Sequence, residues 1–215
     1  GGTTNALLTM HQHHVSRLVC ASSCSIYGDT DVVPLGESAP ANTTNPYALS
    51  KWTCDQPLAE ACRHLPQLSV IALRYFNPIG AHPSGLLGED PLGVPNNVMP
   101  YLAQIAVGRL TELSVFGDDY PTPDGTAIRD YIHVVDVADA HRVALDHFRD
   151  RDDPSGGDQS GFRVFNLGTG SGVSVLELVA AFSAACGTAI PYRIVGRRAG
   201  DVVRLIADPA LVERE

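Results

Sequence analysis

A tyrosine and a lysine lie four residues apart at the start of a predicted helix, in the run Tyr47-Ala48-Leu49-Ser50-Lys51. Residues four apart share a helix face, so the phenol and the ammonium can reach one site. A free tyrosine has a pKa of about 10 and is a poor base at neutral pH. A neighbouring lysine cation favours the phenolate. The pair is therefore suited to removing the proton of a substrate hydroxyl.

A cluster of hydroxyl side chains, Ser22, Ser23 and Ser25, follows a short predicted buried strand over residues 17–21. Active sites of open α/β sheets gather at the carboxyl ends of their strands. A serine at that position can hydrogen-bond the same substrate oxygen that Tyr47 deprotonates. The alternative interpretation is a turn in which the hydroxyls only cap the local backbone.

The elements that position these groups alternate along the chain. Hydrophobic spacing predicts helices over residues 4–14, 47–64, 97–107, 135–148 and 174–186, and strands over 17–21, 69–75, 113–116, 163–167 and 192–195. This alternation predicts an α/β fold with parallel pairing. The Gly- and Pro-rich stretch over 77–95 is longer than most connections, which indicates a functional loop, and residues 150–161 have the composition of a solvated loop. Pro57 falls inside a predicted helix, where it removes a backbone hydrogen bond.

Composition excludes several classes of protein. The 215 residues are 44% hydrophobic and 18% charged, which is ordinary for a globular domain. A net charge of -9 argues against a nucleic-acid partner, and no apolar run reaches the roughly 20 residues of a membrane span. The five cysteines form no C-x-x-C pair, so we expect no disulfide framework and no zinc site, but reduced thiols in the cytoplasm.

Two further patterns favour structural roles. The glycine-rich turn over residues 168–172 has the spacing G-x-G-x-G, and no acidic residue closes the strand over 192–195. A dinucleotide fingerprint needs G-x-G-x-x-G and such an acidic residue, so a structural turn is the expectation. Asp130, His133 and Asp136 straddle a predicted strand-to-helix junction and need not face one metal.

Four long runs carry a resemblance to a known family. SSCSIYG, NPYALSK, ALRYFNPIGAHPSGLLGEDPLGVPNNVMPYL and VFGDDYPTPDGTAIRDYIHVVDVADAH resemble the UDP-glucose 4-epimerases of the extended short-chain dehydrogenase superfamily. The similarity runs from about Gly1 to Asp208. It implies a partial Rossmann-like, doubly wound parallel sheet with a smaller α/β substrate-binding domain. Residues 1–76 would be the C-terminal part of the NAD-binding domain. Residues 77–215 would mainly bind the UDP-sugar, with about 127–170 returning to the first domain.

The resemblance also implies a role for each matching position. Catalysis would use Ser23, Tyr47 and Lys51. The cofactor NAD would be contacted by Ser22, Tyr47, Lys51 and Tyr75. The UDP-sugar would be bound by Ser23, Asn77, Asn96, Asn97, Val98, Val115, Phe116, Arg129, Arg198 and Asp201. Within that set the two arginines would meet the diphosphate, which suits guanidinium geometry, and Asp201 would accept hydrogen bonds from the uridine ribose. No metal is implied.

The reaction that the resemblance implies is NAD-dependent epimerisation at C4 of UDP-glucose and UDP-galactose through a 4-keto sugar, in a cytoplasmic homodimer. In this family a Gly-rich phosphate loop would precede Gly1 and further helical structure would follow Glu215. We therefore expect this chain alone to bind NAD weakly or not at all and to show little or no epimerisation.

Two alternatives stay open at this point. The chain could bind UDP-sugars without catalysis. It could instead come from another sugar-nucleotide enzyme of the superfamily, a 4,6-dehydratase or a decarboxylase. A dehydratase would be expected to carry an acidic pair near the serine cluster, and the run Ser22-Ser23-Cys24-Ser25 offers none.

Overall fold

The computed structural model describes residues 1–149 and 161–215. The helices are α1 (Gly2–Gln12), α2 (Pro46–His64), α3 (Val98–Ala106), α4 (Val134–Arg149), α5 (Val175–Cys186) and α6 (Ala210–Arg214), with a 3-10 turn η1 (Cys24–Tyr27). The strands are β1 (Arg17–Ser23), β2 (Ser69–Tyr75), β3 (Asn77–Ile79), β4 (Leu113–Phe116), β5 (Ile128–His133), β6 (Gly161–Leu167), β7 (Gly172–Ser174), β8 (Tyr192–Val195) and β9 (Arg204–Leu205). Of the loop predicted over 150–161, residues 150–160 lie outside the described residues and Gly161 begins β6.

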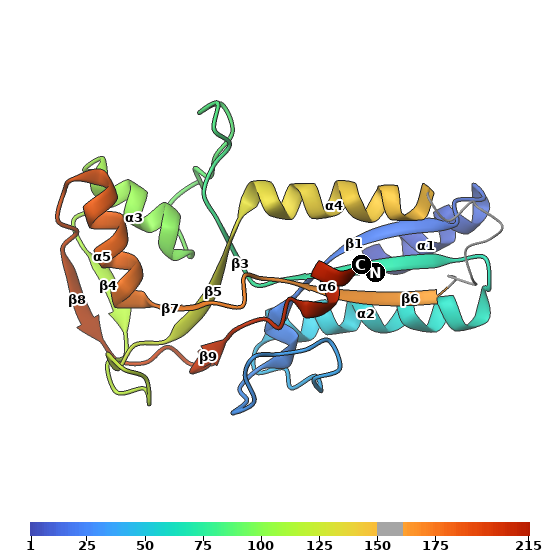
Figure 1. Ribbon diagram of the computed structural model, residues 1–215, viewed down its shortest axis with the longest axis horizontal. Helices are drawn as coiled ribbons and strands as arrows, with labels where there is room; N and C mark the ends of the chain where they lie inside the picture. The colour runs from blue at the N-terminus through green and yellow to red at the C-terminus, as the bar shows by residue number, and fades with distance from the viewer. Residues whose placement is uncertain (150–160) are drawn as a thin grey trace.

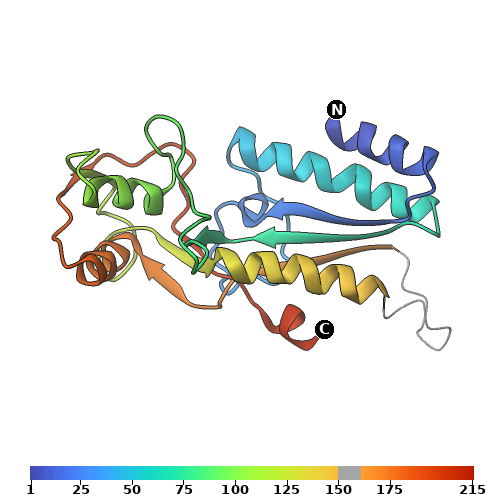
Figure 2. The same cartoon turned by 90° about the horizontal axis from the view of Figure 1, so that it is seen from above.

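A three-stranded parallel sheet, in the order β1-β2-β6, forms the larger lobe. Helices α1 and α2 cover one face and α4 covers the other, as Figures 1 and 2 show together. The central strand β2 is buried along its interior because helices pack on both of its faces. Leu58 and Cys62 of α2 pack on Val70 from one side, and Phe148 of α4 packs on Ile71 from the other.

The smaller lobe pairs β4 with β8 in parallel and packs α3 and α5 beside them (Figure 1). Its core includes Leu102, Val115 and Leu178. Helix α5 begins at a capping box in which Ser174 and Glu177 satisfy each other's backbone N–H groups. Strand β5 connects the lobes because it pairs in parallel with β3 and β9 and antiparallel with β7.

The predicted α/β fold with parallel pairing is confirmed, and each predicted helix and strand is present within a few residues of its expected bounds. The short strands β3, β7 and β9 were not predicted, because two or three residues carry no readable periodicity. No bounds were predicted for β5, which the sequence indicated only as the strand before the junction at Asp130 to Asp136, and helix α6 was not predicted. Helix α2 continues through Pro57, which lies more than a turn beyond Lys51. The division of the chain at residues 76 and 77 stays a prediction.

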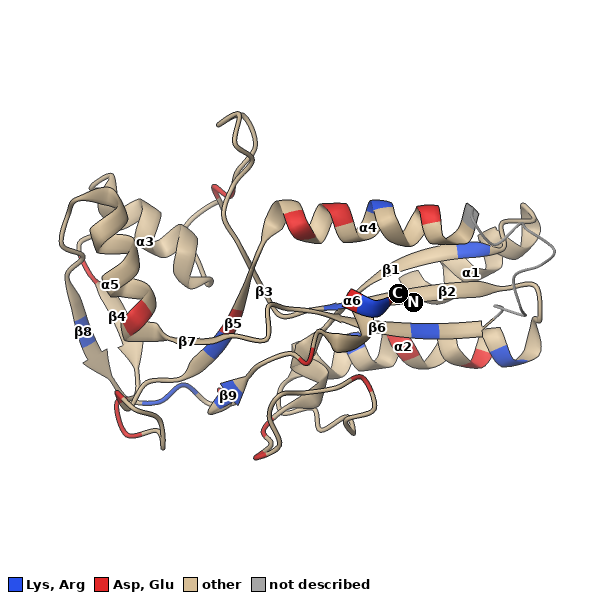
Figure 3. Cartoon of the chain, in the orientation of Figure 1, with Lys and Arg blue, Asp and Glu red and all other residues tan. Residues whose placement is uncertain are grey.

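The charged side chains are spread over both lobes. Figure 3 shows Lys and Arg scattered among the elements and not gathered into one stripe over the described residues. Among those residues, no helix is long and apolar enough to cross a membrane.

Candidate active site

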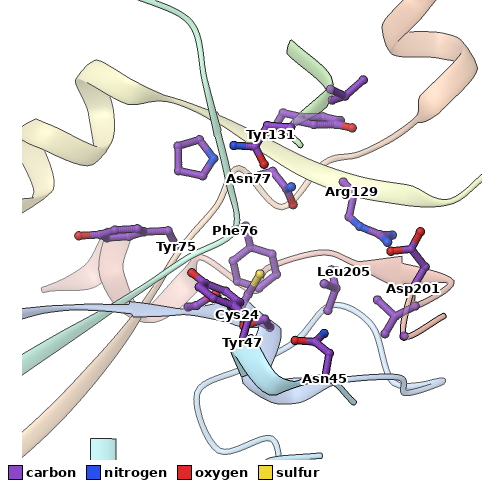
Figure 4. Close-up of a pocket in the computed structure, with 18 of the residues that line it drawn as sticks. Cys24, Asn45, Tyr47, Tyr75, Phe76, Asn77, Arg129, Tyr131, Asp201 and Leu205 are labelled. Atoms are coloured by element: carbon purple, nitrogen blue, oxygen red, sulfur yellow. Dashed lines mark hydrogen bonds between the residues drawn. The ribbon is translucent and has the colours of Figure 1, made fainter. Parts of the chain in front are cut away.

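Two adjoining cavities open where β1 and β2 end. One has a volume of about 450 Å³ and the other about 420 Å³, and they share Asn77, Asn97, Val98, Arg129, Tyr131, Arg198 and Asp201 as lining residues. The first is also lined by Ser22, Ser23, Tyr47 and Tyr75, and the second by Asn96, Val115 and Phe116. Every predicted site residue except Lys51 therefore lines one continuous space. Figure 4 shows Tyr47 and Tyr75 on one side of it and Arg129 and Asp201 on the other.

Ser23 ends β1 and caps η1. Its Oγ accepts hydrogen bonds from the Ser25 backbone N–H at 3.2 Å and from the Ser25 hydroxyl at 2.9 Å. Because both of these bonds are accepted, the hydroxyl keeps its own proton available for a ligand oxygen. Ser23 is thus oriented by its neighbour and still able to donate.

Tyr47 and Lys51 come from the first turns of α2. Asn45 caps this helix by accepting from the Ala48 N–H at 2.9 Å, and Pro46 occupies its first position, as is usual for helix starts. Tyr47 is 57% exposed at the cavity. The Lys51 ammonium donates to the Ala21 carbonyl of β1 at 3.2 Å and lies 5.8 Å from the Tyr47 ring centroid. The predicted pair therefore meets at one place beside the end of β1.

Tyr75 lies opposite Ser23 in the register of the sheet. Its hydroxyl is 2.6 Å from Nε2 of His141, whose Nδ1 is 2.8 Å from the Val137 carbonyl. Since a carbonyl can only accept, Nδ1 carries the proton and Nε2 accepts from Tyr75. Burial raises the pKa of Tyr75 to about 12, and the neighbouring Cys20 and Tyr47 contribute in the same direction. His141 was not predicted as part of the site, and no sequence motif pointed to it.

Ser22 is placed differently from its predicted role. Its hydroxyl donates to the buried Asp55 at 3.0 Å, so that oxygen is engaged in the protein interior, although the residue lines the cavity. A contact between Ser22 and a cofactor stays a prediction. Sequence reasoning missed Asp55 and its partner Arg74. Two signals could have found them, because Asp55 follows Lys51 by four residues and Arg74 is a lone charge in an apolar strand.

The far side of the cavities carries two arginines and one carboxylate. Arg198 and Asp201 form an ion pair at 2.8 Å, and the Arg198 guanidinium lies 5.4 Å from the ring centroid of Phe116. Arg129 donates to the carbonyl of Ile128 at 2.8 Å. Two guanidinium groups facing one carboxylate leave an excess positive charge here. Such a wall suits a diphosphate, which arginine can bind through paired hydrogen bonds.

The glycine-rich turn at residues 168–172 has a structural role, as predicted. The Asp130 carboxylate accepts from the backbone N–H groups of Thr169 and Gly170 at 2.8 and 2.9 Å, from the Thr169 hydroxyl at 2.7 Å and from the Ala207 N–H at 3.1 Å. The N–H groups of Thr169 and Gly170 therefore bind a carboxylate of the protein itself, the side chain of Asp130. Among the described residues, no group of three or more His, Cys, Asp or Glu is arranged to hold a metal ion.

Comparison with known proteins identifies close relatives. The family model described as the NAD dependent epimerase/dehydratase family matches residues 1–168. The chain is 48% identical to the UDP-glucose 4-epimerases of Mus musculus and Bacillus subtilis. Those matches cover all of this chain and 60% and 61% of the relatives, so the chain spans about three fifths of their length.

Solved structures show the same similarity. A UDP-glucose 4-epimerase from Stenotrophomonas maltophila, with bound NAD and formylated UDP-arabinopyranose, matches with a TM-score of 0.92 at 47% identity, over 100% of this chain and 61% of that one. The enzyme from Bifidobacterium longum, in complex with NAD+ and UDP, matches with a TM-score of 0.91 at 47% identity, over 99% and 61%.

Proposed function

The chain belongs to the NAD-dependent epimerase/dehydratase family, and on that premise we propose that it carries the catalytic and sugar-nucleotide-binding residues of an enzyme that interconverts UDP-glucose and UDP-galactose. The observation that carries this proposal is the layout of one continuous space. Ser23 and Tyr47 line one end, with Lys51 beside them, and Arg129, Arg198 and Asp201 line the other. A base and a hydroxyl donor thus face a cationic wall across a cavity.

The residues divide the reaction between them. Tyr47 removes the proton of the sugar 4-hydroxyl while Ser23 donates a hydrogen bond to the same oxygen. Lys51 places a cation beside Tyr47, with its ammonium 5.8 Å from the ring centroid. The arginines hold the diphosphate through charge-assisted hydrogen bonds. Because the firm contacts are made to the nucleotide, the 4-keto sugar can turn over and present its other face.

The residues at the start of α2 and at the end of β2 fit the nicotinamide end of NAD. Lys51 uses one hydrogen bond on Ala21, and an ammonium has three donors, so donors remain for ribose hydroxyls. Tyr47 and Tyr75 add phenol groups beside it. When bound, NAD supplies the acceptor and the source of the C4 hydride.

The competing readings receive less support. The acidic side chain that lines the two cavities within the described residues is Asp201, on the wall away from the serines. A dehydratase would need acidic groups beside Ser23. The relatives at 48% identity are UDP-glucose 4-epimerases. Experiment must distinguish an epimerase from a chain that binds UDP-sugars without catalysis.

The test uses two proteins. The 215-residue chain is titrated with UDP by calorimetry, and a chimera that adds the N-terminal and C-terminal segments of the Bacillus subtilis relative is assayed for conversion of UDP-galactose to UDP-glucose. We expect the chimera to turn over and Tyr47→Phe to lower its kcat by roughly 10²–10⁴-fold, the usual size of an acid–base contribution. Arg129→Ala should weaken UDP binding, whereas Arg109→Ala, at an exposed arginine paired with Asp90, should not.

The outcomes separate the alternatives. UDP binding by the chain together with an inactive chimera would leave the binding-only reading. Activity that survives Tyr47→Phe would refute the assignment of the base.

We also propose that the complete enzyme is a cytoplasmic homodimer whose substrate is a small UDP-sugar, with no nucleic-acid or membrane partner. The five cysteines are all free, which supports a reducing compartment. Cell fractionation would check the proposed location in the cytoplasm. We place the dimer interface on the outward side of α1 and α2, where Leu8 and Leu49 are exposed.

A further inference from the structure

A buried polar network lies directly behind the ends of β1 and β2. The Asp55 carboxylate on α2 accepts from the Ser22 hydroxyl at 3.0 Å and from Nη2 of Arg74 at 3.2 Å. Nη1 of Arg74 donates to the Tyr27 hydroxyl at 3.0 Å, and that hydroxyl donates to Asn166 at 2.7 Å. Asp55 is 1% exposed and Arg74 4%. The network thus joins α2, β1, β2, η1 and β6.

This network adjoins each catalytic group that the proposed function uses. Ser22 precedes Ser23 in β1 and lies opposite Arg74 in the sheet register. Asp55 follows Lys51 by four residues and Tyr47 by eight in one uninterrupted helix, so these three residues share a helix face. Through Asp55, the helix that carries the base is tied to the strand that carries the serine.

The pair is poorly arranged for stability alone. Oδ1 of Asp55 and Nε of Arg74 are buried and have no hydrogen-bond partner among the described residues. A buried ion pair repays its desolvation only with excellent geometry and full hydrogen bonding, and well-packed apolar replacements are often neutral or stabilising. An imperfect pair at this place is better explained by the geometry it fixes.

We propose that Asp55, held by Arg74, is a positioning residue that sets the end of β1, and with it Ser23, against Tyr47 and Lys51 on α2. The inference rests on the proposed function for the roles of those three residues. Asp55 itself does not touch the reacting atoms. Its effect passes through the Ser22 hydroxyl and through the helix.

The test variants weaken the network in two ways. Ser22→Ala removes the bond between β1 and Asp55 and leaves the ion pair intact. The double variant Asp55→Leu with Arg74→Met replaces the pair by apolar side chains of similar shape, so that neither charge is left buried alone.

Alkylation of the 215-residue chain provides a local readout. Cys24 follows Ser23 directly and is 4% exposed, and burial raises the pKa of its thiol to about 12, so it should react slowly. Cys62 is buried further along α2 in a different core cluster and serves as the matched control. Iodoacetamide pulses resolved by mass spectrometry report both thiols in one sample.

We expect each variant to raise the alkylation rate of Cys24 about tenfold through local opening while Cys62 keeps its rate. UDP affinity should stay within about twofold, because Arg129 and Arg198 hydrogen-bond to Ile128 and Asp201, which lie outside the network. In the active chimera, kcat should fall and KM should change little, the pattern of lost transition-state geometry.

Contrary results are equally clear. An unchanged Cys24 rate would show that the network does not hold the end of β1. Cys24 and Cys62 rising together would show that it only stabilises the fold, and either result would overturn the proposal. The alkylation readout does not depend on turnover. An inactive wild-type chimera would therefore count against the proposed function and leave the positioning test standing.

Discussion

At the scale of single residues, the site combines groups whose environments differ sharply. Tyr47 is exposed at the cavity mouth, while Tyr75, on the neighbouring strand, is tied to His141 and has a raised pKa. Ser23 accepts two hydrogen bonds and keeps its proton. The two tyrosines therefore differ in their surroundings. The Tyr47 side chain is exposed to the cavity, whereas the Tyr75 hydroxyl is engaged by His141.

Two of these residues predict a dependence of stability on pH. Burial raises the pKa of Cys24 from 9.0 and of Tyr75 from 10.0, both to about 12. Between those values the folded chain holds protons that the unfolded chain has lost, so the free energy of unfolding falls as pH rises. The stabilisation is complete below pH 9 and is lost toward pH 12. Urea unfolding at several pH values should show this decline.

The variant Cys24→Ala with Tyr75→Phe should flatten part of that decline. Part of it will remain, because burial also raises the pKa of other tyrosines, such as Tyr27 and Tyr131. Cys186→Ala, at an exposed thiol, is the control and should leave the slope unchanged. Identical slopes for the wild type and the double variant would contradict the assignment.

At the scale of elements, short connections hold the cavity together. The turn between β6 and β7 is bound to β5 and to the segment after β9 through four hydrogen bonds to Asp130. Arg129 lies next to Asp130 and pairs in register with Leu205 of β9. One buried carboxylate therefore sets the relative placement of two strands whose side chains line the cavity.

This packing leaves no room for a side chain at Gly168. A Cβ atom there would lie 2.5 Å from the Ala207 Cβ and 2.6 Å from Oδ2 of Asp130. We expect Gly168→Ala to lower the free energy of unfolding by about 1–3 kcal/mol, the usual cost of overpacking, measured by urea denaturation. Gly36→Ala is the matched control, since nothing lies within 4 Å of its added Cβ. Equal stability of the two variants would refute the close approach.

At the scale of the whole molecule, the site lies between two lobes and neither lobe contains all of it. The parallel sheet supplies the serine, and the base comes from the helix beside it. The smaller lobe supplies Val115 and Phe116. The arginines come from β5 and from the segment before β9. Figure 1 shows these segments meeting between the lobes. The shape of the cavity therefore depends on how the lobes are held together, and the pairing of β5 with β9 contributes to this.

The proposed homodimer can be tested on the outer surface of the larger lobe. Leu8 on α1 is 57% exposed and Leu49 on α2 is 53% exposed. We expect Leu8→Glu with Leu49→Glu to convert the chimera from dimer to monomer, because charges are costly to bury in an interface. Light scattering measures the mass, and circular dichroism checks the fold. Val143→Glu, on α4 across the sheet and 51% exposed, should stay dimeric. A wild-type monomer, or equal loss with Val143→Glu, would contradict the interface.

The sequence by itself determined most of the elements and the identity of the chemistry-bearing residues. Periodicity located the five longest helices and five of the strands, since each is a local pattern of apolar side chains. It did not give the bounds of β5. The spacing of Tyr47 and Lys51 predicted a shared face because helix geometry is local. The resemblance added residues far apart in the chain, and the structure brings nearly all of them to one continuous space. Their individual roles stay predictions.

Only the tertiary structure decided which partners these residues have. Asp55, Arg74 and His141 escaped sequence reasoning because their hydrogen bonds connect segments distant in the chain. Contacts between distant segments also explain why the Ser22 hydroxyl donates to Asp55 in the interior, and why the N–H groups of the glycine-rich turn donate to Asp130. A side chain's type fixes which hydrogen bonds it can make, but burial and the neighbours brought by folding decide which ones it does make.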